Sequence, residues 1–157
     1  MKEVVDNLVE WLRDSVKEAN CKGIVYGLSG GVDSAVIAAL SKLAFGDESL
    51  AIMMPINSSF EDEIDAKLVI DKFNLNAIKV DLSRTYSEFV EVVEKGDNQM
   101  AYANVKPRLR MTTLYYYAQL KGYLVVGTSN KSEFTVGYFT KYGDSGSDLM
   151  PLVDFTK

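Results

Sequence analysis

Short apolar runs alternate with longer amphipathic segments along almost the whole chain. Four of the runs are short, rich in β-branched or small residues and often bounded by glycine or proline, which is typical of buried strands. They cover residues 23–28, 50–54, 77–82 and 123–128. The segments between them carry apolar residues at helical spacing. Helices are therefore expected over residues 3–19, 35–43, 60–73, 86–95 and 105–121.

Several of these segments carry a more detailed expectation. The helix over residues 3–19 has one apolar face, which must pack on a sheet or on a partner. The run 77–82 alternates apolar and polar residues, so we expect an edge strand, and the polar residues 98–104 are expected to form a loop. The apolar positions expected in two other helices are Val36, Ala39, Leu40 and Leu43, and Ile64, Leu68, Val69 and Phe73.

The alternation of strands and helices predicts an α/β fold of the Rossmann-like kind. Its sheet is expected to be doubly wound and mostly parallel, with helices on both faces. In such sheets, ligands bind beyond the carboxyl ends of the strands. The segments that follow the four strands are residues 29–34, 55–58, 81–83 and 128–130, which we expect along one edge. A length of 157 residues fits a single domain, residues 1–157.

Two glycines and two serines separate the first strand from the next helix. The segment reads Ser29-Gly30-Gly31-Val32-Asp33-Ser34. Glycines let the backbone approach a ligand closely, and the first N–H groups of a helix have no partner within it, so the segment predicts a phosphate site. Asp33 would repel a phosphate unless Mg²⁺ lies between them. The alternative is a tight turn in which Asp33 only complements the N-terminal end of the helix.

Composition excludes several classes of function. Acidic residues outnumber basic ones by 22 to 17, a net charge of −5, which argues against general nucleic-acid binding. One cysteine allows no intrachain disulfide, and the absence of histidine excludes histidine-based triads and zinc sites. No signal peptide and no apolar run long enough to cross a membrane are visible, so the expected compartment is the cytoplasm.

The glycine-rich loop resembles the pyrophosphate loop of the N-type ATP pyrophosphatases, and it has no Gly-Lys-Ser/Thr ending of a Walker loop. Enzymes of that superfamily cleave ATP between its α and β phosphates and adenylate an oxygen of the substrate. The loop by itself does not distinguish NAD synthetases from GMP synthetases, asparagine synthetases or tRNA-thiolating enzymes.

Four further blocks resemble the NAD synthetases and occur in that family's order. They are residues 104–111, 127–133, 137–144 and 148–152. The resemblance runs from Trp11 to the end of the chain, with small departures at Ser129 and Ser147. Members of the family continue beyond the point that corresponds to Lys157. The resemblance therefore implies a C-terminally truncated chain without the segment that closes over the substrate, which would bind ATP–Mg²⁺ weakly and turn over poorly.

The resemblance also implies roles for individual residues, and it implies no catalytic side chain. The implied ATP-binding residues are Gly27, Leu28, Ser29, Gly30, Gly31, Val32, Asp33, Ser34, Thr128 and Lys157. The implied Mg²⁺ ligands are Asp33 and Glu133, and the implied contacts to the acid dinucleotide are Arg108, Arg110, Lys141 and Asp148. Physical alternatives stand beside these roles, since Glu133 would also suit the start of a helix and either arginine a solvated helix face.

The implied reaction is the ATP-dependent amidation of deamido-NAD. The nicotinate carboxylate would form an acyl adenylate with release of pyrophosphate, and ammonia would then displace AMP to give NAD. A GMP-synthetase-like ATP domain and a nucleotide-binding module without catalysis are the alternatives. NAD synthetases form homodimers, and the candidate surfaces for such an interface are the first helix and residues 114–117.

Overall fold

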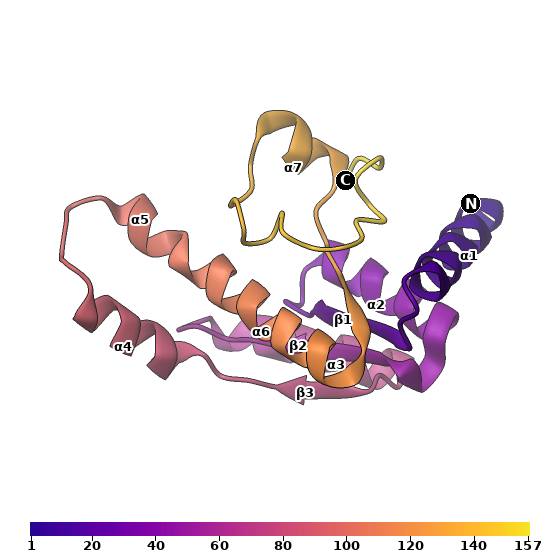
Figure 1. Cartoon of the computed structure of the whole chain (residues 1–157), viewed down its shortest axis with the longest axis horizontal. Coiled ribbons are helices and arrows are strands. Elements are labelled where there is room, and N and C mark those ends of the chain that lie inside the picture. Colours follow the sequence, from indigo (N-terminus) through magenta and orange to yellow (C-terminus); the bar gives the residue numbers. More distant parts are fainter.

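A four-stranded parallel sheet forms the centre of the computed structural model, which describes residues 1–157 (Figure 1). The strands are β1 Gly23–Gly27, β2 Ser49–Met53, β3 Ala77–Lys79 and β4 Tyr123–Val126, in the order β3-β2-β1-β4. The helices are α1 Lys2–Glu18, α2 Val32–Phe45, α3 Phe60–Phe73, α4 Ser83–Val92, α5 Gln99–Ala103, α6 Val105–Lys121 and α7 Lys131–Val136, with a 3₁₀ turn, η1, over Gly46–Glu48. The predicted α/β class with a parallel sheet is confirmed.

The order of the strands determines where a ligand can bind. The chain builds outward from β1 to β2 and β3, then returns along α6 to place β4 on the other side of β1. Val25 at the middle of β1 is paired with Leu50 of β2 and with Val125 of β4. The direction of winding therefore reverses between β1 and β4, and such a reversal opens a crevice at the carboxyl ends of the strands.

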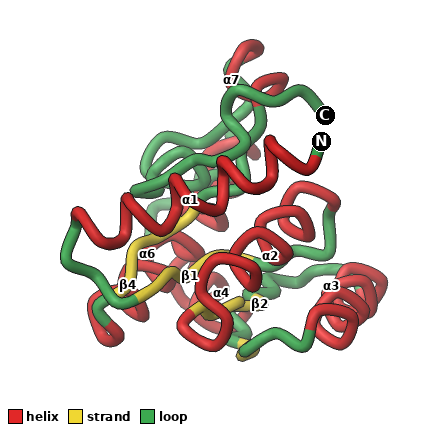
Figure 2. The backbone as a smooth tube through the Cα atoms, turned by 90° about the vertical axis from the view of Figure 1, so that its right-hand side faces the viewer, coloured by secondary structure: helices red, strands yellow, loops and turns green.

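Alternate residues of β1 contribute to two separate apolar clusters, one on each face of the sheet. Ile24 and Tyr26 pack with residues of α1, α2 and α3, whereas Val25 packs with residues of α6. All three side chains are fully buried. Figure 2 looks at the sheet from the side, with α6 on one face and α2 and α3 on the other. The sheet is therefore covered on both faces, as expected of a doubly wound fold.

The predicted elements are present with small shifts, and short helices account for the errors. Helices α3 and α6 have the predicted bounds, and β3 is an edge strand as expected. Residues 98–104 were wrongly expected to be a loop, because the Asn98 side chain accepts from Met100 N and Ala101 N and stabilises α5. Helix α4 begins at Ser83, three residues before the predicted start, since β3 already ends at Lys79.

The expected apolar faces of α2 and α3 are only partly correct. In α2 the buried apolar residues are Ile37, Ala38 and Leu40, while Val36 and Leu43 are 40% and 58% exposed. In α3, Ala66 is the one buried residue, while Ile64 and Leu68 are 42% and 61% exposed. Both helices carry apolar residues on more than one side, so the sequence pattern alone does not identify the side that faces the sheet.

The first helix packs within the molecule. Val9, Leu12 and Val16 of α1 are buried in the same cluster as Ile37 of α2. The choice that the sequence leaves open, between a sheet and a partner, is thus decided in favour of the protein's own core. None of the helices combines the length and the apolar character needed to cross a lipid bilayer.

Candidate functional site

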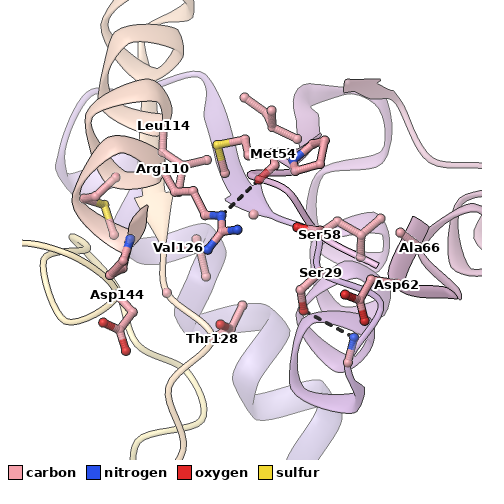
Figure 3. A pocket seen from close by; sticks show the side chains of 18 of the residues that line it. Ser29, Met54, Ser58, Asp62, Ala66, Arg110, Leu114, Val126, Thr128 and Asp144 are labelled. Carbon is pink, nitrogen blue, oxygen red and sulfur yellow. Dashed lines mark hydrogen bonds between the residues drawn. The ribbon is translucent and has the colours of Figure 1, made fainter. Parts of the chain in front are cut away.

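A cavity of about 490 Å³ lies at the carboxyl edge of the sheet, over the ends of β1, β2 and β4 (Figure 3). Its walls come from the loops after these strands, from the first turns of α3 and from the N-terminal half of α6. The volume is that of a typical small-molecule site. Six residues predicted from the sequence line it, namely Gly27, Leu28, Ser29, Gly31, Thr128 and Arg110. Pro55 and Ser58, which were expected at this edge, line it as well.

Two serine hydroxyls hold the predicted phosphate loop in shape. Ser29 Oγ accepts from Gly31 N at 3.2 Å, and Ser34 Oγ donates to Gly31 O at 2.8 Å. The two hydroxyl groups are also 3.1 Å apart and hydrogen bonded. Gly31 is the N-cap of α2, and no side chain caps that helix end. The N–H groups of the first turn of α2 thus remain available to an anion, whereas the serines first of all hold the loop in shape.

Gly30 packs the loop against α3. Its φ angle is +87°, in the region that favours glycine. A Cβ atom at this position would lie 2.7 Å from Asp62 O and 3.1 Å from Ala66 N, both backbone atoms of α3. The glycine is therefore needed twice, for its backbone conformation and for the close contact between the loop and the helix.

The carboxylate of Asp33 interacts with two residues that are far from it in the sequence. Asp33 Oδ2 accepts from Lys157 Nζ at 3.2 Å and from Asn130 Nδ2 at 3.3 Å. The lysine expected to hold ATP phosphates and the carboxylate expected to hold the metal are thus direct neighbours. The structure brings together the start of α2, the segment after β4 and the C-terminal residue.

Glu133 belongs to the same group of residues through Asn130. It lies in the first turn of α7, where the Asn130 side chain accepts from Glu133 N and Glu133 Oε2 accepts from Asn130 N. Asn130 is only 2% exposed. Asn130 therefore contacts both carboxylates that the sequence predicted as metal ligands, that of Asp33 through its side-chain amide and that of Glu133 through its backbone N–H.

This pair of carboxylates fits Mg²⁺. No group of three or more His, Cys, Asp or Glu side chains forms a complete cage of protein ligands. Mg²⁺ does not require one, because it commonly uses one or two carboxylates together with phosphate oxygens and water. Asp33 Oδ1 and Glu133 Oε1 have no hydrogen bond to the protein, so each residue retains a free oxygen for such an ion.

The two predicted arginines lie in different environments. Arg110 Nε donates to Met54 O at 3.0 Å, and its guanidinium group points into the cavity (Figure 3). Burial lowers the pKa of Arg110, and the nearby charge of Asp62 partly offsets this effect. Arg108 Nε instead donates to Lys141 O at 3.1 Å, outside the cavity. Residues two apart on a helix face different directions, which explains the separation.

Lys141 and Asp148 lie in the segment of turns that packs along α6. The side chain of Lys141 is exposed and forms no salt bridge. Asp148 accepts from Tyr115 Oη and from Val125 N, each at 2.8 Å, and Gly146 O lies at the same distance from the Tyr115 hydroxyl group. Burial, and then the Asp148 carboxylate, raise the pKa of Tyr115. Neither Lys141 nor Asp148 lines the cavity, although Asp144 of the same segment does.

The sequence did not reveal every residue of the site. Asp62 and Asp144 line the cavity, and Asn130 joins the two carboxylates, but none of the three was singled out. A signal for Asn130 was present, since an N-cap residue followed three positions later by glutamate is the pattern of a capping box. The segment 81–83 was expected at the cavity edge but does not line it; there, Ser83 Oγ accepts from Asn57 N.

Comparison with known proteins gives consistent matches over nearly the whole chain. Residues 4–157 match the family model described as NAD synthase. The NH(3)-dependent NAD(+) synthetase of Finegoldia magna is 52% identical over 155 residues, which are 99% of this chain and 64% of that protein. The chain therefore spans less than two thirds of that relative's length.

Two solved structures are similar in their backbone. The NMN synthetase of Francisella tularensis superimposes with a TM-score of 0.94 at 37% identity, over 99% of this chain and 66% of that one. The NH3-dependent NAD synthetase of Campylobacter jejuni, solved with a nitrate ion, gives a TM-score of 0.94 at 33% identity, over 99% and 68% of the two chains.

The loop geometry predicts different effects for the two neighbouring glycines. Gly30→Ala should lower the free energy of unfolding by about 2 kcal/mol or more, because the positive φ alone costs about 1–2 kcal/mol and the α3 backbone must also move. Gly31→Ala is the matched control, since its φ is −71° and the nearest atom to the new Cβ is Ser29 Oγ at 3.4 Å. Urea denaturation measures both, and equal losses would contradict this account of Gly30.

Proposed function

Since this chain belongs to the NAD synthase family, we propose that it carries out the ATP-dependent amidation of a pyridine nucleotide. The preferred substrate is deamido-NAD, nicotinate adenine dinucleotide, which reacts with ammonia to give NAD. ATP is consumed, and AMP and pyrophosphate are released. The 52% identity with a relative named as an NH(3)-dependent NAD(+) synthetase supports this choice.

The proposal rests on one observation: groups suited to binding a nucleoside triphosphate lie together at one edge of the sheet. A glycine-rich loop with free helix N–H groups, the Asp33–Asn130–Glu133 group and Lys157 lie together there. The adjoining cavity contains a guanidinium group, that of Arg110. Cations, backbone N–H groups and metal-binding carboxylates together are what a polyphosphate requires.

The reaction proceeds in two displacements. A carboxylate oxygen of the nicotinate ring attacks the α-phosphorus of ATP, the bond to the bridging oxygen breaks, and pyrophosphate leaves. The nitrogen of ammonia then attacks the acyl carbon, AMP leaves with the bridging oxygen, and the nitrogen loses a proton as the carboxamide forms. Neither step requires a nucleophilic side chain, so positioning and charge stabilisation are the main contributions of the protein.

Individual residues have separate tasks in this scheme. The N–H groups at the start of α2 bind the pyrophosphate, and Lys157 offsets its charge. Asp33 and Glu133 would hold Mg²⁺, which would supply further stabilisation of negative charge on the phosphates. We assign Arg110 to the α-phosphate of ATP rather than to the acid dinucleotide that the sequence implied, because its guanidinium group lies in the cavity beside the phosphate loop and has no salt bridge. Lys141, Arg108 and Asp148 are assigned to the acid dinucleotide.

A second candidate substrate is the corresponding mononucleotide. The chain is 37% identical to a protein named as an NMN synthetase, with a TM-score of 0.94. The amidation chemistry would be unchanged, since the nicotinate carboxylate is common to both substrates. Only the contacts to the second nucleotide of the dinucleotide would differ.

We further propose a homodimer, formed in the cytoplasm where ATP and the pyridine nucleotides are available. Of the two surfaces first considered, α1 buries Val9, Leu12 and Val16 in the protein's own core, and residues 114–117 expose tyrosines, 37% for Tyr115 and 63% for Tyr116, rather than aliphatic side chains. The better candidate is the α2–α3 apolar face, which we define as Val36, Leu43, Phe60, Ile64 and Leu68. These exposed residues lie on two helices that pack side by side (Figure 2), and apolar patches of this kind mark interfaces.

The proposed reaction is tested by incubating the protein with ATP, Mg²⁺, ammonium and either deamido-NAD or nicotinate mononucleotide. We expect equal amounts of AMP and NAD at a low rate, in line with the poor turnover that the resemblance implies. Asp33→Asn should reduce their formation further, by roughly a thousandfold, since the lost metal contact is worth several kcal/mol. Asp47→Asn, at an exposed surface pair, is the matched control. Xanthosine monophosphate serves as a negative substrate. Product from the mononucleotide alone would favour the second candidate, and wild-type rates in Asp33→Asn would refute the metal assignment.

Calorimetric titration tests which cationic residues bind ATP and which bind deamido-NAD. Lys141→Ala should weaken deamido-NAD binding by about 10- to 100-fold and leave ATP binding nearly unchanged. Arg110→Gln should have the opposite selectivity, because a hydrogen bond to a charged group contributes about 1.5–3 kcal/mol. Equal losses of both ligands in either variant would show that the assignment is wrong.

The α2–α3 apolar face is tested by light scattering. Introducing a charge with Ile64→Glu or Leu68→Glu should convert the dimer to a monomer, since an unpaired charge would be buried in the interface. Leu120→Glu is the matched control, because Leu120 is 66% exposed on α6, away from that face. Dissociation by Leu120→Glu, with Ile64→Glu still dimeric, would show that the interface lies elsewhere.

A further inference from the structure

The Asn130 side chain uses both ends of its amide. Its Oδ1 accepts from Glu133 N at 3.1 Å, and its Nδ2 donates to Asp33 Oδ2 at 3.3 Å. Its backbone N donates to Glu133 Oε2 at 3.2 Å. Asp33 and Asn130 are 97 positions apart in the chain, so this contact joins the phosphate loop to the segment after β4.

A planar amide suits this connection, because its donor and its acceptor are separate atoms that can bond two groups at once. A carboxamide offers an acceptor and a donor on one planar group, whereas serine and threonine have a single hydroxyl group and aspartate has no donor when ionised. The opposite orientation of the amide would bring Oδ1 against the Asp33 carboxylate and the NH2 group against Glu133 N–H, so the network permits one orientation.

Burial strengthens these bonds and makes them specific. Asn130 is 2% exposed, and a buried amide is costly unless its hydrogen bonds are satisfied. In such surroundings hydrogen bonds are stronger than in water, and the groups that they join are held in a narrow range of positions. Capping of the six-residue α7 accounts for the acceptor end of the amide alone. The donor end contributes nothing to α7 and acts on Asp33.

We propose that Asn130 is the positioning residue that holds the carboxylates of Asp33 and Glu133 at a common distance for one divalent cation. It touches neither the cation nor the nucleotide and acts through the two carboxylates. Each keeps one oxygen without a hydrogen bond to the protein. The inference rests on the proposed function, because it concerns the metal that accompanies ATP.

The test separates the two ends of the amide. Asn130→Ser retains an N-cap acceptor for Glu133 N, but its single oxygen replaces the two-ended amide and the side chain is too short to place a separate donor at Asp33; Asn130→Thr is a second variant of the same design. The matched control is Asn98→Ser, which makes the same change at the N-cap of α5, where the side chain accepts hydrogen bonds from Met100 N and Ala101 N of its own helix.

The probe is Mn²⁺ in the presence of ATP, with the free ion measured by electron paramagnetic resonance. Loss of a group that orients metal ligands typically weakens metal binding by about 10- to 100-fold, and this loss is expected for Asn130→Ser and Asn130→Thr but not for Asn98→Ser. ATP binding in the presence of EDTA should be unchanged in all three variants, which a general disruption of the site would not allow. Thermal unfolding of each variant confirms that the folded protein is measured.

The outcomes distinguish the inference from the proposed function. If the wild-type protein binds no Mn²⁺ with ATP, the proposed function fails and the inference fails with it. If the wild type binds Mn²⁺ and both Asn130 variants bind it equally well, the inference alone is overturned. Failure of both variants to fold would also overturn it, since Asn130 would then be a residue required for folding.

Discussion

Parallel pairing of all four strands is the constraint on which the rest of the molecule depends. Because β2 and β4 both run parallel to β1, the loops after these strands emerge at one edge of the sheet. Each connection must then cross a face of the sheet, and the crossing helices bury Tyr26 on one side and Val25 on the other. The same pairing that fills both cores therefore brings the phosphate loop, Thr128 and the segment leading to Glu133 to one place.

Charged residues that are far apart in the sequence lie close together at this edge of the sheet. The protein is acidic overall, with a net charge of −5, yet the proposed ligand is a polyanion. Asp33 forms a salt bridge with Lys157, a residue far from it in the sequence. Arg110 supplies a second cation from α6, anchored by Met54 O at the end of β2. Local charge rather than net charge thus governs the chemistry of the cavity.

The short helices show how side-chain caps shape the surroundings of the cavity. Helix α7 has only six residues and is capped by Asn130 and Glu133, and α5 has only five and is capped by Asn98. Such short helices have little stability of their own, so their positions depend on caps and on tertiary contacts. In α7 the cap is also the group that contacts Asp33, which links the stability of a local element to the geometry of the site.

The α/β class, the edge position of β3, the bounds of α3 and α6, and a glycine-rich turn after β1 could all be predicted from the sequence. These features depend on periodicity and on glycine, which act over a few residues. Tertiary structure alone decided which sides of α2 and α3 face the sheet, that Arg110 rather than Arg108 enters the cavity, and that Asn130 joins Asp33 to Glu133. The physical reason is that these contacts join segments dozens of residues apart, and their geometry exists only after the strands have paired and the helices have packed.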